Sequence, residues 1–383
     1  MRFDVSSTIH DFAPDEWNQL VHDFPFMKWE FLSSLEKANC IGQKQGFLTQ
    51  IIACRDLQNQ LIGLYYGHLK NHSYGEYIFD WEWAQSYQAA GLEYYPKFTS
   101  SIPFSPVTGP KILLSKDLSS DFKLELQKKL IDYQITLHPT LNSHGLFITE
   151  AECQTYQKSE FLIRHSFQYH WHNKSYQQFS DFLNALKSRK SKAIKKERQQ
   201  VHSYNLEILL VPQSEIAEKA KLFSTFYLNT IEKKGSHAYL NESFFKYLFA
   251  SQAEDLLLFQ ARETDSQKII AMSLYLKSRR TLYGRYWGVD PVLAQKYPLL
   301  HFEMCYYQGI DYCLENKIPL FEAGAQGEHK IPRGFIPSLT YSAHFIRHLG
   351  ARAAIKRAIE HERIAIKQAI ENDIFHSPYR GQI

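Results

Sequence analysis

The order of the predicted helices and strands occurs twice along the chain, and this repetition constrains the fold most. In each half, helices come first, then a run of strands, then a helix and a last strand that contains Leu-Phe, at 146–147 and at 320–321. Similar tetrapeptides, YGEY at 74–77 and YGRY at 283–286, also follow strand-like runs. We interpret them as equivalent positions of a duplicated unit, the alternative being a coincidence between Tyr-rich strands.

A chain of 383 residues is too long for one typical core, so two domains are expected. We predict an α/β (α+β) protein with two tandem domains, each a mixed, mostly antiparallel sheet flanked by helices. The predicted boundaries are 1–160 for the first domain, 161–203 for a bridge with a basic helix, and 204–383 for the second domain.

Charge and cysteine content narrow the class of protein. The net charge of +4 is too small for a dedicated nucleic-acid binder, although a local basic patch remains possible. The five cysteines form no CxxC pair, which argues against a zinc knuckle or a disulfide framework. No signal peptide or membrane-spanning run is recognisable, so a soluble cytoplasmic protein is expected. The oligomeric state stays open.

Three segments carry a resemblance to a known family. They are SSIPFSPVTGPKILL at 100–114, KSRKSKAIKKERQQV at 187–201 and FEAGAQGEHKIPRGFIPSLTYSAHFI at 321–346. Together they resemble the bacterial Fem-like predicted N-acyltransferases, a family of peptidoglycan biosynthesis or recognition proteins with an acetyltransferase-like fold. The resemblance implies an N-acyltransferase that moves an acyl or aminoacyl group to an amine. The alternative is a non-catalytic module that recognises peptidoglycan or its precursor peptides.

The resemblance leaves the donor open between acyl-CoA and aminoacyl-tRNA, either of which would be a co-substrate and not a tightly bound cofactor. Acetyl-CoA enzymes of this fold usually have a Gly-rich loop for the pyrophosphate after the central strand. The corresponding segment here, GVDPVLAQKYPLL, has one Gly and two Pro, which argues against plain acetyl-CoA. A muropeptide-like acceptor, and tRNA as a partner, are compatible with the resemblance.

The Gly-rich segment after the strand that ends at Glu322 is the densest candidate site. Acyl transfer to an amine needs a proton acceptor, for which Glu328 and His329 are candidates. Lys330 and Arg333 are candidates for binding a phosphate or an oxyanion, and Gln326 lies in the same turn. The alternative is a solvated polar loop.

Two neighbouring segments complete the predicted cleft. Strand alternation would place Tyr283, Arg285 and Trp287 on one face, as a groove for substrate. Alternatively, Arg285 pairs with an acidic side chain, at position 303 or 322. Glu303 is a second general-base candidate. It shares a helix face with Tyr307, so a simple surface contact between the two is equally compatible.

The remaining predicted contributions come from outside the second domain. Trp81 and the loop 100–110 of the first domain would form a wall of the cleft. The basic run 187–198 would bind phosphates, and a solvated helix is the alternative. Its predicted phosphate ligands are Arg189, Lys192, Lys195 and Lys196. No metal site is predicted, because the histidines at 165–172 lack a ligand pattern.

Overall fold

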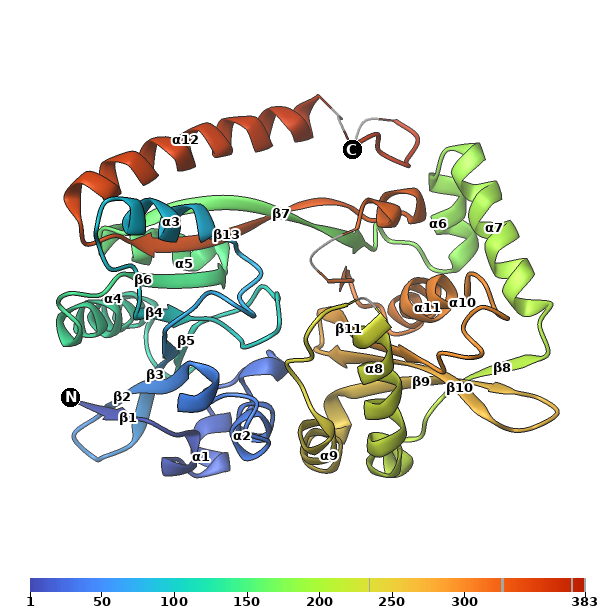
Figure 1. The fold of residues 1–383 in the computed structure, drawn as a ribbon, viewed down its shortest axis with the longest axis horizontal. Coiled ribbons are helices and arrows are strands. Elements are labelled where there is room, and N and C mark those ends of the chain that lie inside the picture. The colour runs from blue at the N-terminus through green and yellow to red at the C-terminus, as the bar shows by residue number, and fades with distance from the viewer. Residues whose placement is uncertain (234, 325–326, 373–374, 382–383) are drawn as a thin grey trace. The chain divides into compact units, whose positions relative to one another are not determined.

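The computed structural model describes residues 1–233, 235–324, 327–372 and 375–381. The chain divides into two compact units. Unit 1 comprises Met1–Phe167 and Leu339–Glu371, and unit 2 comprises Gln168–Ser338 and Asn372–Ile383. Figure 1 shows the elements of both.

Unit 1 is built on a mixed sheet. Its strands are β1 (Arg2–Ser6), β2 (Phe47–Arg55), β3 (Leu61–Lys70), β4 (Lys97–Ser100), β5 (Ile112–Leu114) and β6 (Ser143–Ile148), with the first part of β7 (Leu162–His172) and the last part of β13 (Ile336–Phe345). Strands β1 to β4 pair antiparallel in sequence order, β4 is parallel to β6, and β6 is antiparallel to β13. The helices are α1 (Pro14–Asn18), α2 (Trp29–Lys37), α3 (Trp81–Ala89), α4 (Ser120–Leu137), α5 (Glu150–Lys158) and α12 (Leu349–Glu371).

Unit 2 has the same order of strands. Its further strands are β8 (Leu206–Leu210), β9 (Leu256–Glu263), β10 (Ile269–Lys277), β11 (Thr281–Val289) and β12 (Leu320–Glu322). Strands β8 to β11 pair antiparallel in sequence order, β11 is parallel to β12, and β12 is antiparallel to β7. The helices are α6 (Phe179–Ala185), α7 (Ser188–His202), α8 (Ala220–Lys233), α9 (Glu242–Ser251), α10 (Leu300–Phe302) and α11 (Gln308–Glu315).

The equal strand order explains the repetition in the sequence but corrects one equivalence. The two Leu-Phe pairs lie in β6 and β12, which are the parallel strands of their sheets. The tetrapeptide at 283–286 lies in β11, whereas that at 74–77 lies in the turn after β3. The counterpart of β11 in unit 1 is β4, so the match between the tetrapeptides was wrong. The same Tyr-Gly dipeptide fits a turn in one place and a strand in the other. Gly75 adopts a positive φ of 78° in its turn, whereas Gly284 lies in β11.

The unit boundaries also differ from the predicted ones. Helix α12 was predicted for the second domain, but its contacts place it in unit 1. The reason is that β13 pairs with β6, for example Ala343 with Gly145, and the chain continues from β13 into α12. The predicted bridge is likewise divided, since residues 161–167 belong to unit 1 and residues 168–203, including the basic helix, belong to unit 2.

Local sequence accounts for how the helices begin and pack. Thr149 and Glu152 form a capping box at the start of α5, and the Asn241 side chain caps α9. In unit 2, α8 packs closely on β11, because a Cβ at Gly288 would lie 2.5 Å from the Phe226 backbone. This close approach requires glycine at position 288 and fixes the strand that carries Arg285.

Candidate functional site

The candidate site of unit 2 lies where the chain leaves β12. Gly324 and Gly327 have positive φ values of 85° and 117°, and the short helix η8 (Glu328–Arg333) follows. Gly334 ends η8 with a φ of 93°. These left-handed positions turn the chain sharply and bring the polar side chains of η8 back beside the end of β12. The predicted residue Gln326 lies outside the described residues.

Lys330 is the chemically most unusual residue of this segment. Its side chain is buried, with 3% of the residue exposed, and its Nζ donates a hydrogen bond of 2.8 Å to the Gly324 carbonyl. Burial, and then the positive charge of Arg285, lowers the pKa of Lys330 from 10.5 to about 7. Burial and the nearby charges of His172 and Lys330 also lower the pKa of His170 to about 3. Lys330 therefore occupies a dry, positively charged environment in which an anion would be stabilised.

Arg285 lies at a β-bulge of β11. Opposite β10, Gly284 pairs with Tyr275 and Tyr286 pairs with Leu274, so Arg285 is the extra residue. A bulge interrupts strand alternation, and the predicted common face for Tyr283, Arg285 and Trp287 therefore does not follow from the pattern.

The other predicted residues of these strands occupy different environments. Tyr283 is buried, and it pairs with Glu322, which is also buried, where β11 and β12 run parallel. Arg285 and Trp287 are half-buried, and the Trp287 ring lies edge-on to His301 at 5.4 Å. The structure thus places Arg285, Glu322 and Lys330 near the same end of the parallel pair, and their role in binding substrate stays a prediction.

Glu197 connects the basic helix α7 to the Gly-rich segment, and sequence reasoning missed it. Its carboxylate accepts hydrogen bonds of 3.0 and 2.7 Å from Nε and Nη2 of Arg333. It also accepts a hydrogen bond from the Tyr307 hydroxyl. Burial, followed by this bond to Glu197, raises the pKa of the Tyr307 phenol. The available signal was a single acidic residue within a run of basic ones. Arg333, which was predicted to bind an anion of the substrate, is therefore already bound to a carboxylate.

Glu303 forms a buried ion pair with Arg198 of helix α7. It is fully buried, and Arg198 donates to it at 3.2 and 2.9 Å while also pairing with Asp311 at 2.7 Å. The alternative pairing of Glu303 with Arg285 was wrong, and so was the contact with Tyr307. The reason is the π-helical turn Glu303–Tyr307, which widens the helix where Ser273 and Tyr275 donate hydrogen bonds to the Met304 carbonyl.

The two proton-acceptor candidates of η8 are both exposed. The Nε2 atom of His329 lies 2.8 Å from the hydroxyl oxygen of Tyr306. The Glu328 carboxylate is near enough to Tyr169 to contribute to the raised pKa of that phenol, although burial is the larger cause. Trp81 belongs to unit 1, where its ring contacts Tyr74 at 5.1 Å, and its place in a wall of this site stays a prediction.

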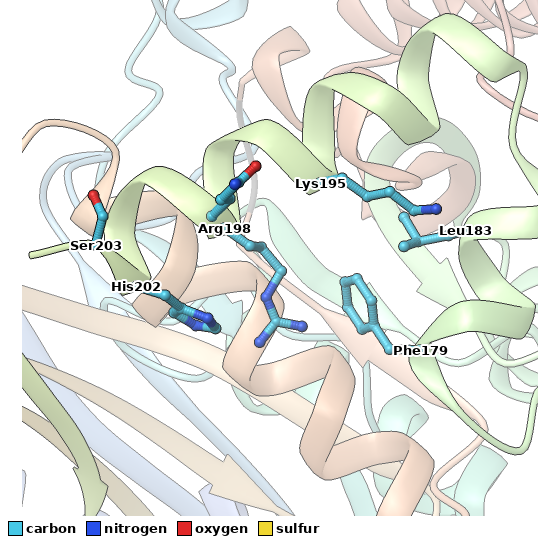
Figure 2. A pocket seen from close by; sticks show the side chains of 7 residues that line it. Phe179, Leu183, Lys195, Arg198, His202 and Ser203 are labelled. Carbon is cyan, nitrogen blue, oxygen red and sulfur yellow. The ribbon is translucent and has the colours of Figure 1, made fainter.

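Helix α7 presents its basic residues to solvent beside an open groove. The four predicted phosphate ligands are all exposed, and the part of the chain that the structure describes gives none of them an ion pair. The groove has a volume of about 610 Å³ and is lined by residues of α6 and α7. Figure 2 shows Arg198 extending from α7 to the side of Phe179, whose ring lies 4.4 Å from the Arg198 guanidinium, and Lys195 extending toward Leu183. Of the four predicted phosphate ligands, Lys195 is the one that lines this groove, together with Arg198, which also anchors Glu303.

The comparisons with solved structures define the class of protein. The crystal structure of FemX superposes with a TM-score of 0.52 at 11% identity, covering 91% of this chain and 98% of that chain. The C-terminal domain of a putative lysylphosphatidylglycerol synthetase from Agrobacterium fabrum gives a TM-score of 0.51 at 8% identity, covering 90% of this chain and 95% of that chain. With the strand order that the two units share, these similarities show that the chain has the mixed α/β fold of these structures.

The family follows from the sequence itself. Residues 8–381 match the model of the FemAB-like family, described as peptidoglycan biosynthesis/recognition, and the chain belongs to this family. No curated protein matches the chain. Within the described residues, no helix is long and apolar enough to cross a membrane, and no three His, Cys, Asp or Glu side chains are placed to hold a metal ion.

Proposed function

We propose that this protein is an N-acyltransferase that moves an acyl or aminoacyl group from an activated carrier to an amine of a peptidoglycan precursor. The observation that carries the proposal is the buried Lys330 side chain of η8, beside the end of β12, in a member of the FemAB-like family. Its lowered pKa of about 7 keeps it charged below that pH. The attack of an amine on an ester or thioester develops negative charge on the carbonyl oxygen. A desolvated cation stabilises that charge far better than a solvated one does.

The loop that follows β11 helps to distinguish between the possible acyl donors. The Asp290 side chain accepts hydrogen bonds from the backbone amides of Val292 and Leu293, at 2.9 and 3.2 Å. These amides follow the central strand, where a pyrophosphate loop would present free amides, and here a carboxylate already occupies them. The contact favours aminoacyl-tRNA, or another carrier that is held elsewhere, over plain acetyl-CoA.

The test of the function is a transfer assay with a defined donor and acceptor. The wild-type protein is incubated with either aminoacyl-tRNA or acyl-CoA and with a muropeptide that has a free amine. Mass spectrometry should detect the acceptor with the mass of one added acyl group. Binding of the muropeptide without transfer from any donor, in wild type and variants alike, would support the recognition module instead.

The proton of the attacking amine must be accepted near η8, and we propose His329 for this role. We expect His329→Gln to reduce kcat by about 10²–10⁴-fold, because general-base catalysis contributes that much. Glu328→Gln, the matched variant, should reduce kcat by less than about tenfold, because both side chains are exposed but, among the described residues, only the His329 ring is positioned by a hydrogen bond, to the Tyr306 hydroxyl at 2.8 Å. Single-turnover transfer rates measure both, and a reversed ranking would move the role to Glu328.

The exposed side of α7 is proposed to bind the phosphates of the carrier or precursor. We expect Lys192→Glu/Lys196→Glu to weaken binding of a phosphate-bearing substrate and to flatten its dependence on salt, because fewer counterions are released. Lys221→Glu/Lys246→Glu changes two exposed lysines of α8 and α9 and the net charge equally. That control pair should keep the wild-type salt slope. Equal slopes in all three proteins would remove the role of α7.

A further inference from the structure

Unit 1 has a groove of about 430 Å³ between α5 and α12. Each helix contributes four residues at the spacing i, i+3, i+4 and i+7, which corresponds to one face of a helix. They are Glu150, Cys153, Gln154 and Gln157 on α5, and Lys356, Ile359, Glu360 and Arg363 on α12. Two helix faces are therefore directed at the same space, and every residue that lines it belongs to unit 1.

The floor of the groove is mainly apolar. It comes from the start of β7, where Phe161 is buried and Ile163 is half-buried, and from Tyr341 of β13. The rings of Tyr341 and His165 lie edge-on at 5.2 Å and complete the floor. An apolar floor with a few polar groups at the rims is typical of a site for a small organic ligand.

Contacts at two places along α12 fix the width of the groove. Arg352 donates a hydrogen bond of 2.6 Å to the Glu160 carbonyl, just before β7. Three turns further along the helix, Arg164 of β7 donates hydrogen bonds of 2.7 and 2.9 Å to the two carboxylate oxygens of Glu362. The groove is therefore formed before a ligand arrives, which lowers the free-energy cost of binding.

The rims carry equal numbers of acidic and basic side chains. Glu150 and Glu360 are acidic, Lys356 and Arg363 are basic, and all four are exposed. Glu360 lies four residues from Lys356 and three from Arg363, a spacing at which helix side chains can pair. Among the described residues, however, none of the four forms an ion pair. The lining has no net charge, which favours a ligand without net charge over an anion or a cation.

Glu150 and Arg363 lie at the same end of the groove, on opposite rims. Burial, and then the Arg363 charge, lowers the pKa of His165, while the Glu150 charge acts on it in the opposite direction. Burial, followed by the Glu150 charge, raises the pKa of Tyr341. Both charges therefore act on the same part of the floor without pairing with each other. A small molecule with an ammonium and a carboxylate on one carbon can pair with both at once.

We propose that this groove binds a zwitterionic α-amino acid with an apolar side chain. Its ammonium pairs with Glu150 and its carboxylate with Arg363, while its side chain lies along the floor at Ile163 and Phe161. The charged groups fix the orientation of the ligand, and the floor selects for an apolar side chain. The site is independent of the acyl-transfer site proposed for unit 2, and no transfer reaction is needed to test it.

The first test is calorimetry on the full chain with L-leucine and L-phenylalanine as probes. The controls each lack one feature of leucine: isocaproate has no ammonium, isoamylamine has no carboxylate, and glycine has no side chain. We expect each control to bind at least about tenfold more weakly than leucine. Binding of isocaproate or isoamylamine as tight as that of leucine would overturn the zwitterion. No binding of either amino acid up to about 10 mM would overturn the site.

Two substitutions test the assigned partners. We expect Glu150→Gln and Arg363→Gln each to weaken leucine binding by at least about tenfold. Glu150→Gln should not weaken isocaproate further, since that probe has no ammonium to lose a partner. Arg357→Gln changes an exposed residue of α12 that does not line the groove, and it should leave the affinity within about twofold. Unchanged leucine binding in Glu150→Gln or Arg363→Gln, or an equal loss in Arg357→Gln, would overturn the assignment.

A cysteine in the groove reports where leucine binds. Cys153 lines the groove and is half-buried, and Cys305 of unit 2, also half-buried, is the internal control. We expect saturating leucine to slow the alkylation of Cys153 by N-ethylmaleimide and to leave that of Cys305 unchanged, as measured by mass spectrometry of the digested protein. Unchanged alkylation of Cys153, or slower alkylation of Cys305 alone, would show that leucine binds elsewhere.

Discussion

Replacing Lys330 by Met is expected to reduce kcat/KM for acyl transfer by about 10²–10³-fold, which is the range seen when an oxyanion donor is removed. Met has a similar length and fits an apolar environment, so the loss would come from the missing charge. In the wild-type protein, the pKa of Lys330 is lowered to about 7, and the charged form therefore disappears as the pH rises through 7. We expect kcat/KM to fall over the same range, because this parameter reports on the free enzyme.

Lys330→Arg is the matched control for the pH dependence. Arginine stays protonated at every accessible pH, so the decline of kcat/KM above pH 7 should disappear in this variant even if its absolute rate is low. Rate measurements between pH 5.5 and 9 would decide. A rise of kcat/KM through pH 7 that persists in His329→Gln and disappears in Lys330→Arg would mean that neutral Lys330 acts as a proton acceptor.

Stability gives a second readout that does not require substrate. The folded-state pKa of Lys330 is below its ordinary value of 10.5, so the unfolded chain binds more protons between about pH 7 and 10.5. The contribution of Lys330 to the free energy of unfolding of the wild-type protein should therefore rise with pH between about pH 7 and 10.5. Lys330→Met should lack that rise and should be more stable than the wild type below pH 7, since no charge has to be buried.

Replacing Arg198 by Met is expected to lower the free energy of unfolding by about 3–5 kcal/mol, because it removes the cation that donates two hydrogen bonds to the fully buried Glu303 carboxylate and leaves only the His202 ring, at 3.7 Å, as a second basic group beside it. The double variant Arg198→Met/Glu303→Gln should recover the part of this loss that comes from Glu303, and Arg198→Met/Glu303→Gln/Asp311→Asn, which also removes the second partner of Arg198, should recover more. Urea unfolding, followed by tryptophan fluorescence, measures the free energy of unfolding of the wild type and of each variant. If the double and triple variants are both as unstable as Arg198→Met, the ion pairs of Arg198 are not the cause.

The same variants separate the structural and catalytic interpretations of Glu303. We expect Glu303→Gln to keep kcat within about fivefold of the wild type, because Arg198 retains Asp311 as a partner at 2.7 Å. A general base in this position would instead give a loss of about 10²–10⁴-fold in a folded protein. Circular dichroism on the same samples ensures that only folded protein is compared.

The site residues show how far pattern reasoning reaches. The Gly-rich turn after Glu322 was predictable, because closely spaced glycines next to polar residues after an apolar strand indicate a turn that presents side chains. The bulge at Arg285 was not, because a bulge depends on the register of β11 against β10 and not on the residues of β11 alone. Glu197 was missed for a similar reason. Its partners Arg333 and Tyr307 are more than one hundred positions away in the sequence.

The sequence by itself determined the duplicated order of helices and strands, which depends on local periodicity. It also determined the membership in the FemAB-like family, through the resemblance of three segments to that family, and the resemblance implied the fold. Only the tertiary structure decided that α12 belongs to unit 1, that Arg198 neutralises Glu303, and that Lys330 is buried with a pKa near 7. The physical reason is that ion pairing and desolvation depend on distances between residues that are remote in the chain, and no local pattern encodes those distances.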